Sequence, residues 1–188
     1  MKVIPLINKT LEEKSPRGVK KKRSYFYISE AGKTPFEIFK SMTGYDYVSH
    51  RMQRVFDNGN DVHERIIGYL IRQGVVAARE VRMRTRLFRG RADAIIFADG
   101  RIAVLEVKSM KKEDFQKLKK YGSRKAYLQL QLYLHFLGID DGIILVECKD
   151  DQRIKEFHIK RKFRVAQELI TQFTRLKRKF VEGGVMAA

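Results

Sequence analysis

Two carboxylates and a lysine occur at spacings that could place them at one end of a β-hairpin. Asp93 lies six residues before the dipeptide Asp99-Gly100, and Glu106 lies six residues after it. Asp-Gly between two apolar runs is the strongest short-range signal for a tight hairpin turn, so Asp93 and Glu106 are expected to meet across the ribbon. Strand side chains alternate faces, which puts Lys108 on the same face as Glu106. Such a set can hold a hard divalent cation and orient a water molecule, which is chemistry suited to cutting phosphodiester bonds.

An ordinary surface ion-pair cluster is the alternative explanation for these three residues. Charged residues are common at strand ends, and exposed ion pairs contribute little to stability. Residues 102–105, however, read Ile-Ala-Val-Leu, and such a continuous apolar run is typical of a buried central strand. An unpaired charge beside a buried strand is costly, which favours a functional site.

The composition indicates a folded protein that binds a polyanion. At 188 residues the chain is long enough to bury a core as one domain. It carries 40 Lys and Arg against 22 Asp and Glu, a formal net charge of +18, while 44% of its residues are hydrophobic. Excess positive charge on a folded domain indicates nucleic acid as the partner.

The same composition argues against a membrane or secreted protein. No apolar run approaches the roughly 18 residues that a membrane span requires, and the apolar stretch at the start is too short for a secretory signal. Cys148 is the only cysteine, so neither a disulfide framework nor a cysteine-built metal site is expected. A cytoplasmic protein is predicted, and the sequence is compatible with an oligomer.

The pattern of apolar and turn residues predicts a basic N-terminal arm, residues 1–24, and a single domain, residues 25–188. A helix is predicted to begin at Thr34-Pro35-Phe36-Glu37, which combines a cap, a first-turn proline and a capping-box glutamate. Residues 58–61, Asn-Gly-Asn-Asp, are predicted to be a loop that caps a second helix ending near Gly74. The other expected elements are a strand over 77–87, the hairpin, a helical stretch over 113–137 broken at 121–123, strands over 142–148 and 153–159, and a helix over 161–181.

Gln129 falls within an apolar surface when residues 127–137 are placed at helical pitch, and Tyr133 lies one turn further on the same face. A glutamine in such a surface must find hydrogen-bond partners. A metal-site carboxylate, a metal-bound water or a phosphate would serve, and so would a buried backbone group.

His63 is predicted to lie on the inward face of its helix, together with Ile66 and Leu70. A histidine in this position is either a satisfied core residue or, if the helix lies beside the hairpin, a third metal ligand. Imidazole ligation would favour manganese over magnesium, because magnesium prefers oxygen.

Four short motifs follow one another between residues 58 and 160. In chain order they are Gly59-Asn60-Asp61-Val62-His63-Glu64, Gly90-Arg91-Ala92-Asp93, Glu106-Val107-Lys108 and Gln129-Leu130-Gln131-Leu132-Tyr133. In order, spacing and context they resemble the motifs of the RecB-type nucleases of the PD-(D/E)XK superfamily, including prokaryotic and viral exonucleases. The resemblance implies an α/β (α+β) fold with a restriction-endonuclease-like core, in which helices flank a central mixed β-sheet.

The resemblance also implies roles for the matched residues. The expected ligands of Mg²⁺ or Mn²⁺ are His63, Asp93, Glu106 and the backbone carbonyl of Val107. Lys108 would position the attacking water or help to deprotonate it, and Gln129 and Tyr133 would bracket the site or the DNA strand. One branch of these nucleases holds an iron–sulfur cluster through cysteines. Thr34 stands where the first of them is expected, so no iron–sulfur cluster is predicted.

Two basic segments are expected to follow the DNA backbone, although each could be only a solvated face. They are Lys20, Lys21, Lys22 and Arg23 in the arm and Arg175, Lys177, Arg178 and Lys179 near the end of the chain. The charge and the carboxylate–lysine set predict a divalent-metal-dependent deoxyribonuclease, and the resemblance to the RecB-type nucleases implies an exonuclease that acts on DNA ends.

Three alternatives remain open. A structure-specific endonuclease such as a junction resolvase could use Asp93, Glu106 and Lys108 but would not need His63 or the Gln129–Tyr133 pair. A non-catalytic DNA-binding protein is the second alternative, against which the intact carboxylate–lysine set argues. A membrane-surface or interaction protein using the basic C-terminal helix is the third.

Overall fold

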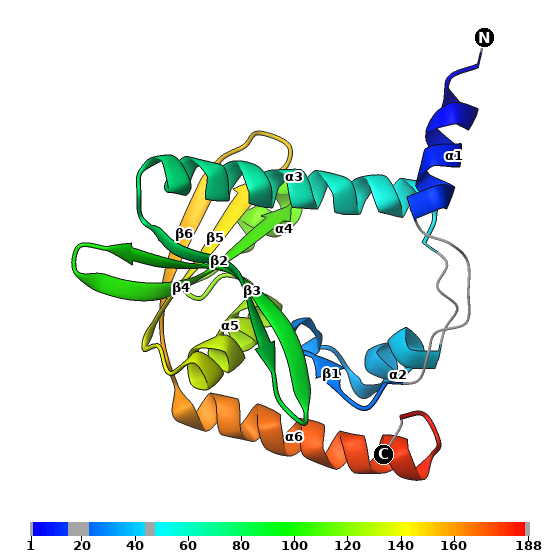
Figure 1. Cartoon of the computed structure of the whole chain (residues 1–188), viewed down its shortest axis with the longest axis vertical. Helices are drawn as coiled ribbons and strands as arrows, with labels where there is room; N and C mark the ends of the chain where they lie inside the picture. Colours follow the sequence, from blue (N-terminus) through cyan, green and yellow to red (C-terminus); the bar gives the residue numbers. More distant parts are fainter. Residues whose placement is uncertain (1, 15–22, 44–47, 187–188) are drawn as a thin grey trace.

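A six-stranded mixed β-sheet forms the centre of the computed structural model, which describes residues 2–14, 23–43 and 48–186. The strands are β1 (Phe26–Tyr27), β2 (Val76–Arg84), β3 (Phe88–Ala98), β4 (Arg101–Met110), β5 (Asp141–Cys148) and β6 (Ile154–Lys160). The helices are α1 (Ile4–Lys14), α2 (Pro35–Thr43), α3 (His50–Arg72), α4 (Lys112–Gln116), α5 (Arg124–Leu137) and α6 (Phe163–Glu182), with a 3-10 turn, η1 (Ile28–Glu30). Helix α3 covers one face of the sheet, and α5 and α6 cover the other (Figure 1). The predicted α/β fold with a central mixed sheet flanked by helices is confirmed.

Strand β3 is the strand around which the sheet is organised. One of its edges pairs with the antiparallel strand β2 from Arg89 to Ile96. Its other edge pairs with β1, in parallel, only up to Arg89, and with β4, antiparallel, only from Ala94 onward. Strand β4 continues beyond this ladder as the parallel partner of β5, and β5 pairs antiparallel with β6. Among the described strands, none therefore pairs with residues 90–93 on that edge of β3, and the sheet forks there.

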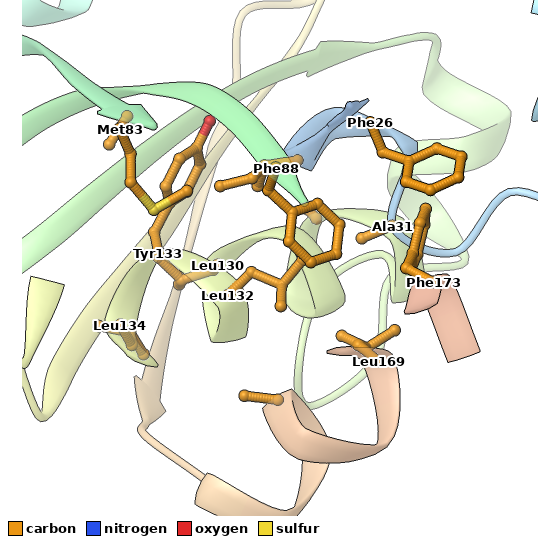
Figure 2. Close-up of a cluster of buried hydrophobic side chains, with 14 of the residues drawn as sticks. Phe26, Ala31, Met83, Phe88, Leu130, Leu132, Tyr133, Leu134, Leu169 and Phe173 are labelled. Atoms are coloured by element: carbon orange, nitrogen blue, oxygen red, sulfur yellow. The ribbon is translucent and has the colours of Figure 1, made fainter. Parts of the chain in front are cut away.

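Two apolar clusters fill the space between the sheet and its helices. On the α5 and α6 face, Phe88 meets Phe173 with ring centroids 5.0 Å apart, and Phe26 meets the same ring at 4.9 Å (Figure 2). Val104 belongs to this cluster, whereas Val107 belongs to the cluster beneath α3. The alternation along β4 therefore directs Glu106 and Lys108 toward α5, as predicted from the hairpin pattern.

The predicted hairpin turn is confirmed. Asp99 and Gly100 connect β3 to β4 with φ angles of 52° and 70°. Two central residues with positive φ define the turn type whose twist matches the flanking strands. The ladder runs from the Ala98–Arg101 pair to the Ala94–Leu105 pair, so Asp93 and Glu106 are the first residues beyond it.

The loop predicted at residues 58–61 is wrong, because α3 is continuous through it. The helix begins much earlier, where Ser49 accepts a hydrogen bond from the Met52 backbone amide at 3.3 Å. Glycine and asparagine are poor helix formers, but tertiary packing commonly overrides so weak a preference. Here the buried residues Val62 and Ile66 fix the following turns against the sheet. His63 consequently lies in the middle of a long helix and not in a first turn.

Other predicted boundaries agree with the structure to within a few residues. The capping box before α2 is present, since Thr34 and Glu37 exchange hydrogen bonds of 2.7 and 3.2 Å. The helical stretch is broken as predicted, but the break between α4 and α5 spans residues 117–123 and is longer than the predicted 121–123. Within the predicted basic arm, residues 4–14 form α1, which the charge pattern did not indicate. No helix in the described part of the chain is long and apolar enough to cross a membrane.

Candidate active site at the fork of the sheet

Tyr133 takes the place of a neighbouring strand at the fork. Its hydroxyl accepts a hydrogen bond from the Arg91 backbone amide at 3.0 Å and donates one to the Arg91 carbonyl at 2.8 Å. The backbone amide and carbonyl of Arg91, on the otherwise unpaired edge of β3, are thereby both satisfied. Tyr133 rises from α5 toward β2 and β3, beside Met83 (Figure 2). Burial raises the pKa of the Tyr133 hydroxyl, and nearby Glu106 raises it further.

The contact between Tyr133 and β3 requires a residue without a side chain at Gly90, because Tyr133 and Ile28 occupy the space that a side chain would need. A β-carbon at this position would lie 2.9 Å from the Tyr133 hydroxyl and 2.9 Å from the Cδ1 atom of buried Ile28. We expect Gly90→Ala to lower the free energy of unfolding by about 1–3 kcal/mol, because overpacking forces rigid neighbours to shift. Urea denaturation measures this change. Gly68→Ala is the matched control, since no atom apart from its chain neighbours and the backbone of its own helix lies within 4 Å of its β-carbon position; it should stabilise α3 by up to about 1 kcal/mol. Equal stability of the two variants would contradict the close contact.

Glu106 is a buried carboxylate with an incomplete set of partners. It is 1% exposed, and its Oε1 atom accepts hydrogen bonds from Gln129 Nε2 at 2.7 Å and from the Lys108 ammonium. Its Oε2 atom is also buried and has no hydrogen-bond partner among the described residues. Of the partners that the sequence left open for Gln129, the structure shows a carboxylate, that of Glu106. A buried acceptor without a donor is costly, and a bound cation would satisfy it.

The electrostatics of Glu106 and Lys108 are coupled. Burial raises the pKa of Glu106 to about 7; Lys108 opposes this rise, and the charge of Asp93 adds to it. Burial by itself lowers the pKa of Lys108, but the adjacent Glu106 carboxylate outweighs burial, so the pKa of the ammonium lies above its ordinary value.

The raised pKa of Glu106 predicts how stability depends on pH in the metal-free protein. Because the folded state holds this proton more tightly than the unfolded state, the contribution is complete below about pH 4.5 and is lost as the pH rises through about 7. We expect the wild type in EDTA to lose stability relative to Glu106→Gln as the pH rises from about 4.5 to about 7, by at most about 3 kcal/mol in total and with little further loss above pH 7, since one pKa unit corresponds to about 1.4 kcal/mol. Thermal unfolding of both proteins between pH 5 and 9 measures the difference. Parallel curves over this range would contradict the prediction.

Asp93 lies at the same fork and faces α3. Its Oδ2 atom accepts a hydrogen bond of 2.7 Å from the Val107 backbone amide and lies 3.4 Å from Nδ1 of His63. The His63 and Asp93 side chains are 31% and 19% exposed, so both are accessible from solvent. Ala92 and Ala94 belong to the apolar clusters on opposite faces, so the alternation of β3 breaks at Asp93. The fold thus brings the predicted residues His63, Asp93, Glu106, Lys108, Gln129 and Tyr133 to one fork.

The donors at the fork fit a hard divalent cation in chemistry but are not assembled around a single point. Among the described residues, no group of three His, Cys, Asp or Glu side chains converges closely enough to hold a metal ion. Glu106 turns toward Lys108 and Gln129, whereas Asp93 turns toward His63. Binding by both carboxylates would therefore require them to close on the ion, with the unsatisfied Oε2 atom of Glu106 as an available ligand.

A buried ion pair fixes the helix that carries His63. Arg65, two residues along α3, donates a hydrogen bond of 2.7 Å to Glu147 at the end of β5, and Glu147 is 1% exposed. This pair and the apolar contacts of Val62 and Ile66 hold α3 on the sheet. The position of His63 therefore depends on residues outside the fork.

Among the described residues, the basic side chains predicted to bind DNA on α6 share no cavity with the fork, whereas Arg23 lies near it over Tyr27. Arg23 donates a hydrogen bond of 2.7 Å to Glu30, and its side chain is only 13% exposed. Arg175 and Lys179 border a cavity between α2 and α6 that shares no residue with the cavities beside the fork. Lys177 and Arg178 lie on the same helix, α6. Lys20, Lys21 and Lys22 lie outside the described residues.

Two cavities flank the fork, and few of the residues that line them were predicted from the sequence. A cavity of about 280 Å³ is lined by His63, Asp93, Arg79 and Arg91, among others. A cavity of about 350 Å³ contains Gln129 and Tyr133 together with arginines from β2 and β3. The dense arginines of residues 79–91 are the only signal in the sequence that could have indicated these walls.

Comparison with known proteins gives matches at the level of structure only. No protein-family model and no curated protein matches this sequence. The crystal structure of SSO0001 aligns with a TM-score of 0.59 and 20% identity over 92% of this chain and 87% of its own. The alkaline exonuclease LHK-Exo from Laribacter hongkongensis aligns with a TM-score of 0.62 and 15% identity over 87% and 91% of the two chains. A phage-related exonuclease from Haemophilus somnus 129PT gives 0.52 and 11% over 86% and 96%. At these identities the likeness establishes the fold, and this chain has the mixed α/β architecture of these exonucleases.

Proposed function

We propose that this protein is a divalent-metal-dependent deoxyribonuclease of the RecB type that degrades DNA from an end. The observation that carries the proposal is the buried Glu106 carboxylate, which lies between Lys108 and Gln129 at the fork and keeps one oxygen unsatisfied. Among the described residues, Glu147 also keeps one buried oxygen unsatisfied, but it pairs with Arg65 away from the fork. Glu106 differs because the charges of Asp93 and His63 act on it together with that of Lys108. The exonuclease fold of the neighbouring structures supports the same assignment.

Each side chain at the fork has a role in this proposal. Asp93 and Glu106 are the carboxylate ligands of Mg²⁺ or Mn²⁺, and His63 and the Val107 backbone carbonyl complete the set. A bound ion would supply Lewis acidity toward the scissile phosphate and the attacking water. Gln129 holds the Glu106 carboxylate in place from α5.

Lys108 and Tyr133 act on the geometry of the reaction. Glu106 holds the Lys108 ammonium at the fork, where it can orient a water and offset the charge that develops on the phosphate. Tyr133 keeps the β3 edge at a fixed height above α5 through Arg91. The burial of Glu106 keeps bulk water away from its carboxylate, which strengthens its interactions with Lys108 and Gln129.

Digestion of end-labelled linear DNA and closed circular DNA, with and without manganese, tests the function. The proposal expects linear DNA to be degraded from an end and the circle to survive, with all cleavage lost in EDTA. Undiminished cleavage in EDTA overturns metal dependence. Equal rates on circular and linear DNA, or cleavage confined to four-way junctions, would instead identify an endonuclease.

His63 distinguishes the RecB-type assignment from the resolvase alternative, because only the former uses it. Its 3.4 Å approach to Asp93 supports a ligand role. We expect His63→Gln to weaken Mn²⁺ binding by at least about 10-fold, because losing even an outer partner of a metal ligand costs about 10- to 100-fold. Activity should then recover partly at high Mn²⁺, as titration of rate against Mn²⁺ would show. If His63 is only a core histidine, thermal stability falls while the Mn²⁺ dependence of the folded protein stays that of the wild type.

A further inference from the structure

A second candidate site borders the fork, in the cavity of about 350 Å³ between β1, β2, β3 and α5. It shares Gln129 and Tyr133 with the fork, so a ligand in it would lie next to Glu106. Its wall contains Arg82, Arg84, Arg89 and Arg91. Among the described residues, no Asp or Glu lines it, whereas the neighbouring cavity contains Glu64, Glu80 and Asp93.

The charge of this cavity is largely uncompensated. Arg91 pairs with Glu80 at 2.9 Å, but Arg82 and Arg84 form no ion pair with any described residue. Both are exposed on β2, where their guanidinium groups can reach a ligand in the cavity. Arginine presents a planar set of donors that matches the oxygens of a phosphate. The cavity is therefore suited to a phosphate group.

A stack of aromatic rings and guanidinium groups forms its outer wall. Tyr27 lines the cavity and is 46% exposed. Its ring meets that of Tyr25 edge to face, with centroids 5.5 Å apart. Arg89 lies over Tyr25 at 3.8 Å, and Arg23 lies over Tyr27 at 4.5 Å. An aromatic face beside a row of arginines is the arrangement that binds single-stranded nucleic acid.

Glu30 holds this wall in place before any ligand binds. It is buried, and its carboxylate accepts hydrogen bonds from Arg23 at 2.7 Å, the Tyr27 backbone amide at 2.9 Å and the Ser41 hydroxyl at 2.9 Å. Little conformational freedom is therefore left for a ligand to remove on binding.

We propose that this cavity binds a nucleotide of single-stranded DNA adjacent to the phosphodiester at the fork, with its phosphate on Arg82, Arg84 and Arg89 and its base against Tyr27. This inference deepens the proposed function and rests on it, because the strand at the fork is the substrate. Inside a duplex both faces of a base are covered by its stacked neighbours, so a base that stacks on Tyr27 must be unstacked from its strand, and the site favours single strands over the interior of a duplex. The arginines neutralise phosphate charge in any sequence.

Fluorescence anisotropy tests the proposal without cleavage. All proteins carry Glu106→Gln and are titrated in EDTA against a labelled oligo-dT strand of about 12 nucleotides and a labelled blunt hairpin duplex. We expect Tyr27→Ala to weaken single-strand binding by about 5- to 100-fold, the range measured for loss of one stacked base, and to leave duplex binding unchanged. Tyr27→Phe, which keeps the ring, should bind like the parent.

Arg84→Ala tests the phosphate contacts independently, since this exposed residue should be replaceable without unfolding the protein. Its single-strand affinity should fall, and the slope of log affinity against log salt should become about 0.7 less steep. Arg101→Ala, which removes an exposed arginine at the hairpin turn, is the control and should change neither value. Parent-like single-strand affinity of Tyr27→Ala overturns the stacking site, as does an equal loss for the duplex. If Tyr27→Ala fails to fold, a parent-like slope for Arg84→Ala overturns it.

The outcome is separable from that of the proposed function. Wild-type protein that cuts DNA, together with variants that bind like the parent, contradicts this inference alone. Variants that lose single-strand binding, together with wild-type protein that never cuts DNA, contradict the proposed function and leave the binding site standing.

Discussion

Glu106→Gln should abolish DNA cleavage, lowering the rate on the order of 10³-fold or more, while the protein remains folded. The amide matches the carboxylate in volume and can still receive the Gln129 and Lys108 donors, but it lacks the charge needed to bind a divalent cation. Asp93→Asn should also abolish cleavage, because it removes the second carboxylate charge. The variant should stay folded, because its amide oxygen can still accept the hydrogen bond from the Val107 amide. Rates on end-labelled linear DNA at saturating Mn²⁺, with thermal unfolding of each variant, measure both consequences.

Glu156→Gln is the matched control for these variants. It removes the same charge from an exposed position on β6, where Glu156 contacts His158, and cleavage should stay at the wild-type rate. Lys108→Ala should also lose most activity. Unlike Glu106→Gln, it should lower the stability of the protein, because it leaves the Glu106 carboxylate buried without its ammonium partner. A wild-type rate for Asp93→Asn would remove the basis of the nuclease assignment.

Arg65→Met should destabilise the protein by about 3 kcal/mol, the largest loss of stability that we expect from one surface-reaching side chain. The substitution leaves Glu147 buried without its partner, and breaking a buried pair from one side is strongly destabilising. The estimate is at the low end of the usual range because the Arg65 side chain is 39% exposed. Urea denaturation at neutral pH measures the change.

Two further variants separate the ion pair from other effects on α3. Arg54→Met removes an exposed arginine from the same helix and should change stability by less than about 0.5 kcal/mol. Replacing Glu147 by Met in the Arg65→Met protein removes the unpaired buried charge and should restore most of the loss. A double variant as unstable as Arg65→Met would show that packing, and not the buried charge, is responsible.

Elements determined by neighbouring residues were predictable from the sequence. The Asp99-Gly100 turn and the capping box of Thr34 and Glu37 depend on contacts within a few residues, and both are present. The spacing of Asp93 and Glu106 around that turn sufficed to place them together, because hairpin register follows from the turn. The Asn58-Gly59-Asn60 segment misled the prediction, because its low helix propensity is overridden by contacts of α3 with the sheet.

Features assembled from distant segments were beyond local patterns. At helical pitch Gln131 falls on one polar stripe with His135, a pattern typical of an exposed face. In the structure Gln131 is fully buried; it donates a hydrogen bond to the Lys160 carbonyl and accepts one from the Lys162 amide. These partners lie about 30 residues away, in the connection between β6 and α6. The arginine-lined cavity is likewise built from β1, β2, β3 and α5, so its charge becomes visible only after folding.

The fork also separates the two carboxylates mechanically. Asp93 belongs to the strand that leads toward β1 and β2, and Glu106 to the strand that leads toward β5 and β6; both stand just beyond the last pair of their common ladder. A small change in the opening of the fork would alter their separation without breaking a ladder hydrogen bond, and the hydrogen bond from the Val107 amide to Asp93 would have to adjust. Magnesium binds oxygen at about 2.0–2.1 Å and calcium at about 2.3–2.6 Å. If both carboxylates bind one ion, its radius sets how far the fork closes, and the protein would select its cofactor by the span between two strands as much as by the identity of the ligands.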